Sequence, residues 1–171
     1  MSLRRIEQST HVAASPEAVW HAVTNVDVAS FRHPAYLAAL GIPKPMRAEV
    51  VRSGVGGARV AHFENGLRFS QEITAWTPGE HYAFTFRPDA GFRVACVLDL
   101  ADGPFRMVSG AYRLTPVAGG TRLSLSSDYE LRGAAGALLG VPVRLVLWLF
   151  QAYLLRGLAR NAERRDRRPS A

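Results

Sequence analysis

The stretch Val12-Ala13-Ala14-Ser15-Pro16-Glu17-Ala18-Val19-Trp20 marks a change from strand to helix periodicity. Before it, the side chains of residues 4–14 alternate between two faces, which predicts a first strand. One of these faces carries Ile6, Gln8, Thr10 and Val12. Within the stretch, Ser15 is a favoured N-cap, Pro16 suits the first helical position, and Glu17 suits the positive end of a helix dipole. A short helix therefore follows the first strand.

The next segment is less regular. Asp27 is a candidate N-cap for a second short helix that runs through Phe31. Gly41, Pro43 and Pro45 then indicate a loop.

From residue 46 to 132 the pattern predicts an antiparallel sheet whose strands are joined by short turns. The expected strands cover 46–53, 58–64, 67–76, 80–87, 105–115 and 121–131. Asn65-Gly66 is a strong hairpin signal, because both positions tolerate positive φ. Residues 88–104 are the least defined part, with 94–100 as a candidate extra strand. In the strand over 67–76, alternation places Phe69, Gln71, Ile73 and Ala75 on one face.

The end of the chain changes period again. We expect the main C-terminal helix over about 142–166, followed by a tail over 167–171. A helix of this length spans roughly 38 Å at about 1.5 Å per residue, the width of a domain of this size. Neither a linker nor an internal repeat is visible, so residues 1–171 are interpreted as a single domain.

Composition limits the class of protein. The 171 residues are 48% hydrophobic and 20% charged, which is typical of a globular domain. Cys96 is the only cysteine, which excludes an intramolecular disulfide framework and a zinc site built from several thiolates. The N-terminal residues lack the apolar core of a signal peptide, so a cytoplasmic location is expected.

The net charge of +7 is concentrated at the C-terminal end. Residues 156–171 carry six arginines against Glu163 and Asp166. Such a segment is either a solvated helix end, where cations also suit the helix dipole, or a contact for nucleic acid or anionic lipid. We expect no specific nucleic-acid partner.

Two motifs in this order carry a family resemblance. Residues 12–20, quoted above, resemble the opening of the START and birch-pollen-allergen-like helix-grip superfamily (SRPBCC), and Gly119-Gly120-Thr121-Arg122-Leu123 resembles the hairpin before its last strand. Among bacterial members of this superfamily, the chain most resembles those of the polyketide cyclase/dehydrase type. The resemblance implies an α+β fold: a curved antiparallel sheet of six to eight strands around a long C-terminal helix, with two short helices after the first strand.

The resemblance also implies a cavity between the sheet and the C-terminal helix for a hydrophobic small molecule or lipid. Aromatic and polar side chains recur on one face of the expected sheet, and they either line such a cavity or simply fill the core. The candidate ligand-binding residues are Phe69, Gln71, Tyr82, Phe84, Phe86, Tyr112, Tyr129 and Trp148, with Ser127 on the same face.

Catalytic motifs are weak. The five histidines show no helical zinc-ligand spacing, so neither a metal nor a cofactor is expected. His62, in register with Val60 on its strand, is a candidate general base if it faces the cavity. Tyr82, Tyr129 and Gln71 are further candidate groups for the aldol-type cyclisation or dehydration that the resemblance suggests.

The C-terminal helix is more apolar than one sheet face requires. Arg144 and Gln151, seven residues apart, form only a thin polar line within residues 143–159. The helix is therefore gripped on several sides, buried in a homodimer, or in contact with a membrane. A true membrane span would remove the cover of the apolar sheet face, so peripheral contact is the form of the membrane alternative that we retain.

These observations predict a domain that binds a hydrophobic small molecule or lipid. A polyketide cyclase/dehydrase-type enzyme and a membrane-associated interaction module are the two alternatives, and a homodimer is the expected assembly.

Overall fold

The fold is seen in a computed structural model that describes residues 2–27, 31–89, 93–94, 98–99 and 103–167. Cys96 lies outside these residues.

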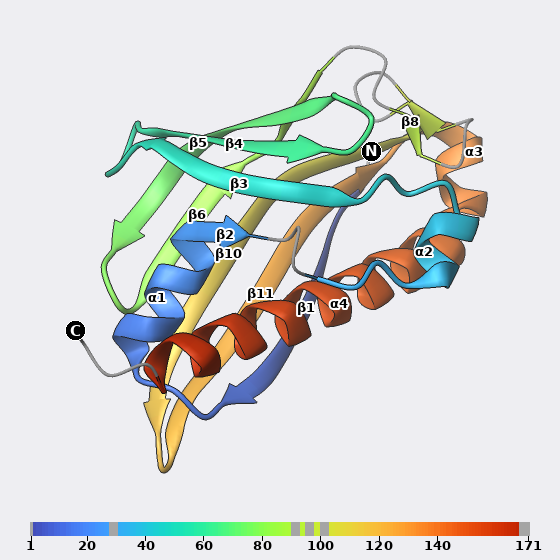
Figure 1. Ribbon diagram of the computed structural model, residues 1–171. Helices are drawn as coiled ribbons and strands as arrows, with labels where there is room; N and C mark the ends of the chain where they lie inside the picture. Colours follow the sequence, from blue (N-terminus) through green and yellow to red (C-terminus); the bar gives the residue numbers. More distant parts are fainter. Residues whose placement is uncertain (1, 28–30, 90–92, 95–97, 100–102, 168–171) are drawn as a thin grey trace.

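Eight strands form one antiparallel sheet in the order β1-β11-β10-β6-β5-β4-β3-β2. Their bounds are β1 Ser2–Val12, β2 Asn25–Asp27, β3 Pro45–Arg52, β4 Ala58–Phe63, β5 Arg68–Thr77, β6 His81–Thr85, β10 Phe105–Val117 and β11 Gly120–Leu131. A short β7, Arg87–Pro88, pairs with β5. The sheet curves around a long C-terminal helix, as Figure 1 shows. The expected α+β helix-grip fold is confirmed.

The helices are α1 Pro16–Thr24, α2 Ala35–Ala39, α3 Gly133–Leu138 and α4 Gly140–Asp166. The predicted cap of α1 is confirmed, since the backbone N–H of Ala18 donates to the Ser15 hydroxyl at 3.3 Å. The long helix begins at Gly140, two residues before Pro142. Proline is tolerated there because the N–H groups of the first turn have no partner within the helix. Helix α3 was not predicted from the sequence.

The candidate short helix capped by Asp27 and running through Phe31 falls mainly on residues outside the described part of the chain, and the described second helix is α2. Asp27 is the last residue of β2, and α2 begins just after Pro34. In β2, Val26 pairs with Ala48 of β3, and both residues are buried. This pairing accounts for the extended conformation of residues 25–27. Residues 28–30 lie outside the described part of the chain.

The candidate strand over 94–100 is not one continuous strand in its described parts. Arg93–Val94 forms β8 and Leu98–Asp99 forms β9, and the two pair with each other in an antiparallel manner. Residues 95–97 and 100 lie outside the described residues.

Two β-bulges change which residues face the helix. In β10 the register shifts between Met107 and Ser109, so Val108 is the extra residue. In β5 the register shifts between Ile73 and Ala75. As a result Ala75, predicted on the same face as Ile73, pairs with Ala83 and faces outward, and Trp76 packs inward.

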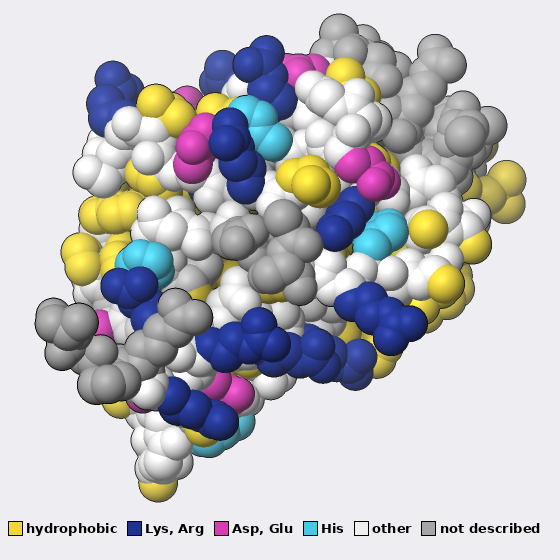
Figure 2. Space-filling model, in the orientation of Figure 1, with side chains coloured by type: hydrophobic (Ala, Val, Ile, Leu, Met, Phe, Trp, Pro, Cys, Tyr) yellow, Lys and Arg dark blue, Asp and Glu magenta, His cyan; other side chains and the backbone are white. Residues whose placement is uncertain are grey.

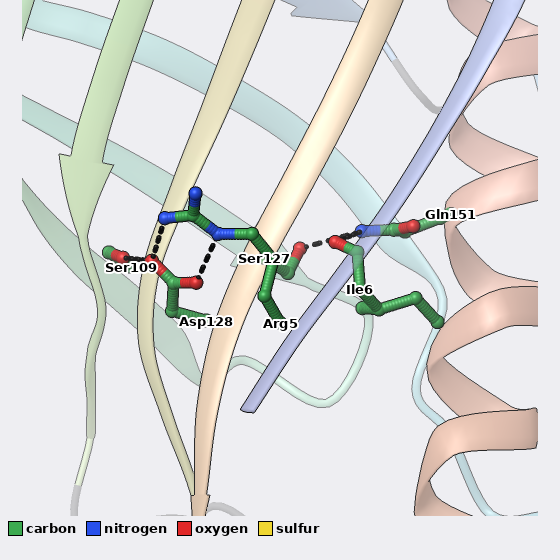
Figure 3. A network of polar contacts seen from close by, with 6 residues as sticks. All are labelled: Arg5, Ile6, Ser109, Ser127, Asp128 and Gln151. Carbon is green, nitrogen blue, oxygen red and sulfur yellow. Dashed lines mark hydrogen bonds and ion pairs between the residues drawn. The ribbon is translucent and has the colours of Figure 1, made fainter. Parts of the chain in front are cut away.

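Helix α4 lies across the concave face and is tied to the sheet by a buried amide. The Gln151 Nε2 donates to the Ser127 hydroxyl at 2.9 Å and to the Ile6 carbonyl at 3.4 Å. On the opposite face of the sheet, Arg5 forms a bidentate ion pair with Asp128, which also accepts a hydrogen bond from Ser109. Figure 3 shows both networks. They cross-link strands β1, β10 and β11.

Candidate functional site

A cavity of about 330 Å³ lies between the concave sheet face and α4, and the segment after α2 closes part of it. Its volume falls at the small end of the range of roughly 300–1,000 Å³ that is usual for ligand pockets. The wall is predominantly apolar, and α4 supplies much of it. The lining residues are Val26, Leu40, Ile42, Pro43, Pro45, Arg47, Ala48, Arg59, Ala61, Phe63, Phe69, Gln71, Phe84, Phe86, Phe105, Met107, Tyr112, Leu125, Ser127, Leu139, Pro142, Val143, Val146, Leu147, Phe150, Gln151, Leu154 and Leu158.

Most of the candidate ligand-binding residues lie in this wall. Phe69, Gln71, Phe84, Phe86 and Tyr112 line the cavity, together with Ser127. Strand alternation places them there, because every second side chain of a strand faces the same side. Three neighbouring strands of the sheet, β5, β6 and β10, contribute four of these five residues. Their role in binding a ligand remains a prediction.

Three other candidates lie outside the wall of the cavity. Tyr82 is fully buried in the core beside Trp20 and Trp76. Tyr129 is buried at the side of Phe105. Trp148 is 48% exposed on the outer side of α4, so it does not face the cavity.

His62 does not face the cavity either. Arg59, Ala61 and Phe63 line it, so alternation turns His62 and Val60 to the outer face of β4. There the His62 Nε2 lies 3.3 Å from a carboxylate oxygen of Glu49. The predicted register of His62 with Val60 is right, but this placement contradicts its suggested position as a base inside the cavity.

No sequence motif marks Arg59, which is the most unusual residue of the site. Its side chain is only 5% exposed, although arginine is almost never fully buried without a partner. Its Nη1 donates to the Gln71 Oε1 at 3.0 Å, and the two residues are direct cross-strand partners on β4 and β5. Its Cζ lies 5.2 Å from the ring centroid of Phe84 and 5.7 Å from that of Tyr82.

The two tyrosines near this cation titrate above their usual range. Burial raises the pKa of Tyr82 to about 12, and the charge of Arg59 offsets part of the rise. Burial also raises the pKa of Tyr112, and Arg59 acts in the opposite direction through its charge and a hydrogen bond. Both hydroxyls are therefore protonated at neutral pH. A neutral phenol can donate a hydrogen bond to a bound group but does not act as a base.

Gln151 forms a second polar point in the wall. It is 2% exposed, and its amide accepts from the Gln8 Nε2 at 3.4 Å in addition to its bonds to Ser127 and Ile6. These bonds satisfy both ends of the amide. Of the polar line predicted through Arg144 and Gln151, Gln151 belongs to the cavity wall and Arg144 is exposed.

Among the described residues, no group of three or more His, Cys, Asp or Glu side chains is placed to hold a metal ion. The expectation of no metal or cofactor stays a prediction.

The outer side of α3 and α4 carries an apolar stripe, which consists of Leu138, Val141, Leu145 and Trp148. All four are exposed, Leu138 by 83% and Val141 by 81%. Helix α4 is long and apolar enough to cross a membrane by length and composition, but core helices of soluble proteins pass the same criterion. Figure 2 shows a row of Lys and Arg side chains over α4. The exposed arginines of α4 are Arg144, Arg156, Arg160, Arg164 and Arg165.

Comparison with known families gives a match over nearly the whole chain. Residues 4–163 match the family described as polyketide cyclase / dehydrase and lipid transport. No curated protein is similar enough in sequence to count as a match.

Solved structures with the same fold are numerous. The Zhui aromatase/cyclase from Streptomyces sp. R1128 has a TM-score of 0.63 and 19% identity, with 97% of each chain covered. Ara h 8.0201 has a TM-score of 0.61 and 17% identity, over 94% of this chain and 98% of its own. A protein from Thermus thermophilus has a TM-score of 0.61 and 20% identity, over 93% of this chain and 97% of its own. At these identities the likeness shows the fold alone.

Proposed function

The chain belongs to the polyketide cyclase / dehydrase and lipid transport family, and we propose that it binds a hydrophobic small molecule or lipid between its sheet and α4. The observation that carries the proposal is the cavity of about 330 Å³. Its wall combines aromatic and aliphatic side chains with a few polar groups, the usual composition of a ligand pocket. Burial of a ligand's apolar surface against this wall supplies the driving force.

Two experiments test this proposal on the full chain. Native mass spectrometry of the purified protein should reveal a copurifying small molecule. Titration with an environment-sensitive dye should give saturable binding, and Ala61→Trp should weaken it at least tenfold because Ala61 lines the cavity. Ala111→Trp is the matched control, since Ala111 pairs with Ala83 on the outer sheet face. A dye that fails to saturate, or equal effects of the two variants, would contradict the proposal.

The second candidate function is cyclase or dehydrase chemistry on a poly-β-keto chain. The observation in its favour is that Arg59 and Tyr112 both reach the cavity wall as donors able to polarise a carbonyl. The described lining offers no His, Asp or Glu as the base. Turnover of a poly-β-keto thioester by the wild-type chain, lost in Tyr112→Phe, would establish this second function.

The apolar stripe gives the expected homodimer a physical basis. A two-fold contact would cover it on both copies with one self-complementary surface. Peripheral contact with anionic lipid is the alternative use of the same stripe, next to the exposed arginines. A cytoplasmic location, with or without membrane contact, remains a proposal that cell fractionation tests.

A further inference from the structure

Arg59 is a buried cation that has no carboxylate partner among the described residues. The ion pairs of these residues join other groups, such as Arg5 to Asp128. The hydrogen bonds of Arg59 go to neutral groups, the amide of Gln71 and the hydroxyl of Tyr112. Removing an ion from water carries an effective penalty of several kcal/mol unless a counter-ion or several hydrogen bonds compensate for it.

The compensation within the protein is incomplete. A guanidinium carries five N–H donors. Gln71 and Tyr112 account for part of them, and the Nε of Arg59 is buried without a hydrogen-bond partner in the described structure. The faces of Phe84 and Tyr82 stabilise the positive charge but accept no strong hydrogen bond. Arg59 also lines the cavity, so a molecule bound there has access to N–H groups of the guanidinium other than the enclosed Nε.

The shape of the guanidinium selects the group that it would bind. Its planar fork matches the two oxygens of a carboxylate, and such charge-assisted pairs are the strongest protein hydrogen bonds. Gln71 holds the fork in place from the neighbouring strand. Since Arg59 is only 5% exposed, the partner oxygen atoms must lie inside the cavity and not at its rim.

The apolar residues of the cavity wall determine what the rest of the ligand, beyond the group bound by Arg59, must look like. Rings of Phe69, Phe86 and Phe105 face the same space, as do aliphatic side chains of α4. The volume of about 330 Å³ suits one chain or ring system rather than a two-chain lipid.

We infer that the natural ligand is a single-chain or aromatic monocarboxylate that enters the cavity carboxylate first and pairs with Arg59. This inference rests on the proposed function, because it names the class of molecule that occupies the same cavity.

Calorimetric titration of the full chain with decanoate, 1-decanol and decyl phosphate at pH 8 tests the inference. We expect decanoate to bind at least tenfold more tightly than decanol. In Arg59→Met this preference should disappear while decanol still binds, because the apolar wall is retained. Arg113→Met is the control, since Arg113 is exposed on β10, and it should keep the preference. Arg59→Lys keeps the charge without the fork and should retain only part of the preference.

The outcomes separate the inference from the proposed function. Equal binding of decanoate and decanol by the wild-type chain, or an unchanged preference in Arg59→Met, overturns the carboxylate assignment and leaves hydrophobic binding intact. Tighter binding of decyl phosphate than of decanoate overturns it in favour of a phosphate ligand. If none of the three compounds binds, the proposed function fails together with the inference.

Discussion

The ring of Phe31 lies directly against the backbone of α4 at Gly157. A Cβ atom built on Gly157 would lie only 2.1 Å from the Phe31 Cε2, closer than real atoms approach. Phe31 also packs edge-on against Tyr153, one turn earlier in the helix. The absence of a side chain at Gly157 therefore allows the segment before α2 to dock on α4.

Gly157→Ala should destabilise the protein by about 1–3 kcal/mol, because the added methyl group overpacks the site. Helix propensity alone predicts the opposite sign, a gain of about 1 kcal/mol. Urea denaturation measures the difference. Combining the change with Phe31→Ala should remove most of the clash. A stabilised single variant would show that Phe31 does not hold this position.

Gly110→Ala should narrow the cavity. Its Cβ would lie 3.0 Å from the Phe84 ring and 3.2 Å from the Phe86 ring, and both rings line the cavity. We expect the rings to shift into the cavity and the affinity for a bound dye to fall severalfold. Titration of the variant measures this effect. Ala111→Ser, on the outer sheet face, is the control, and an equal loss in both variants would argue against the explanation.

Replacing the pair Arg59 and Gln71 by Met and Leu should make the empty protein more stable. Exchange of a buried polar pair for apolar side chains of similar size is often neutral or stabilising by about 1–4 kcal/mol. Gln71→Leu alone should instead destabilise by about 1–3 kcal/mol, because it removes the amide acceptor of the buried cation. Thermal unfolding compares the three proteins. A double variant less stable than the wild-type protein would mean that the pair is a net source of stability.

Asp128 should contribute a pH-dependent share of the stability. Its hydrogen bonds and ion pair with Arg5, together with the Ser109 hydroxyl, hold its pKa below the usual carboxyl value. A depressed folded pKa means that the contribution is fully present above the unfolded pKa of about 3.9, and is lost as pH falls through the folded value. The melting temperature of the wild type should therefore drop more steeply below pH 4 than that of Asp128→Asn. Parallel curves would contradict this linkage.

The apolar stripe should mediate self-association. Sedimentation at tens of micromolar should show a dimer, and Trp148→Glu should convert it to a monomer, since a charge replaces the apolar ring in the contact. A wild-type monomer that binds anionic vesicles would assign the stripe to a membrane surface. A monomer that ignores vesicles would mean that the stripe is simply tolerated in water.

Local signals in the sequence were sufficient for the elements that depend on neighbouring residues. The Ser15 cap, the Asn65-Gly66 turn and the alternation of the main strands lie where expected. The position of α2 after Pro34 was not predicted, because no side-chain cap marks its start. The bulges were also invisible, because an extra residue is detected only against its partner strand.

The alternation of side chains predicts which residues of a strand share a face, but it does not predict which of the two faces lines the cavity. Alternation groups His62 with Val60, but both faces of β4 combine apolar residues with one basic or titratable residue, so its pattern does not show which face meets the cavity. Arg59 was not proposed as a site residue because an arginine on an alternating strand normally faces water. Its cross-strand pairing with Gln71 is the signal that would have found it, and this register belongs to the folded sheet.

The β-bulge at Val108 reverses the alternation of inward-facing and outward-facing side chains along strand β10. Before this residue, the odd-numbered side chains of Phe105 and Met107 face the cavity, and after it the even-numbered side chain of Tyr112 does so. Deleting one residue here would exchange the inward and outward sets in half of the strand, whereas a point substitution alters a single position. During divergence, insertions and deletions at this bulge would therefore reshape the lining of the cavity in one step, without any change to the turns that connect the strands.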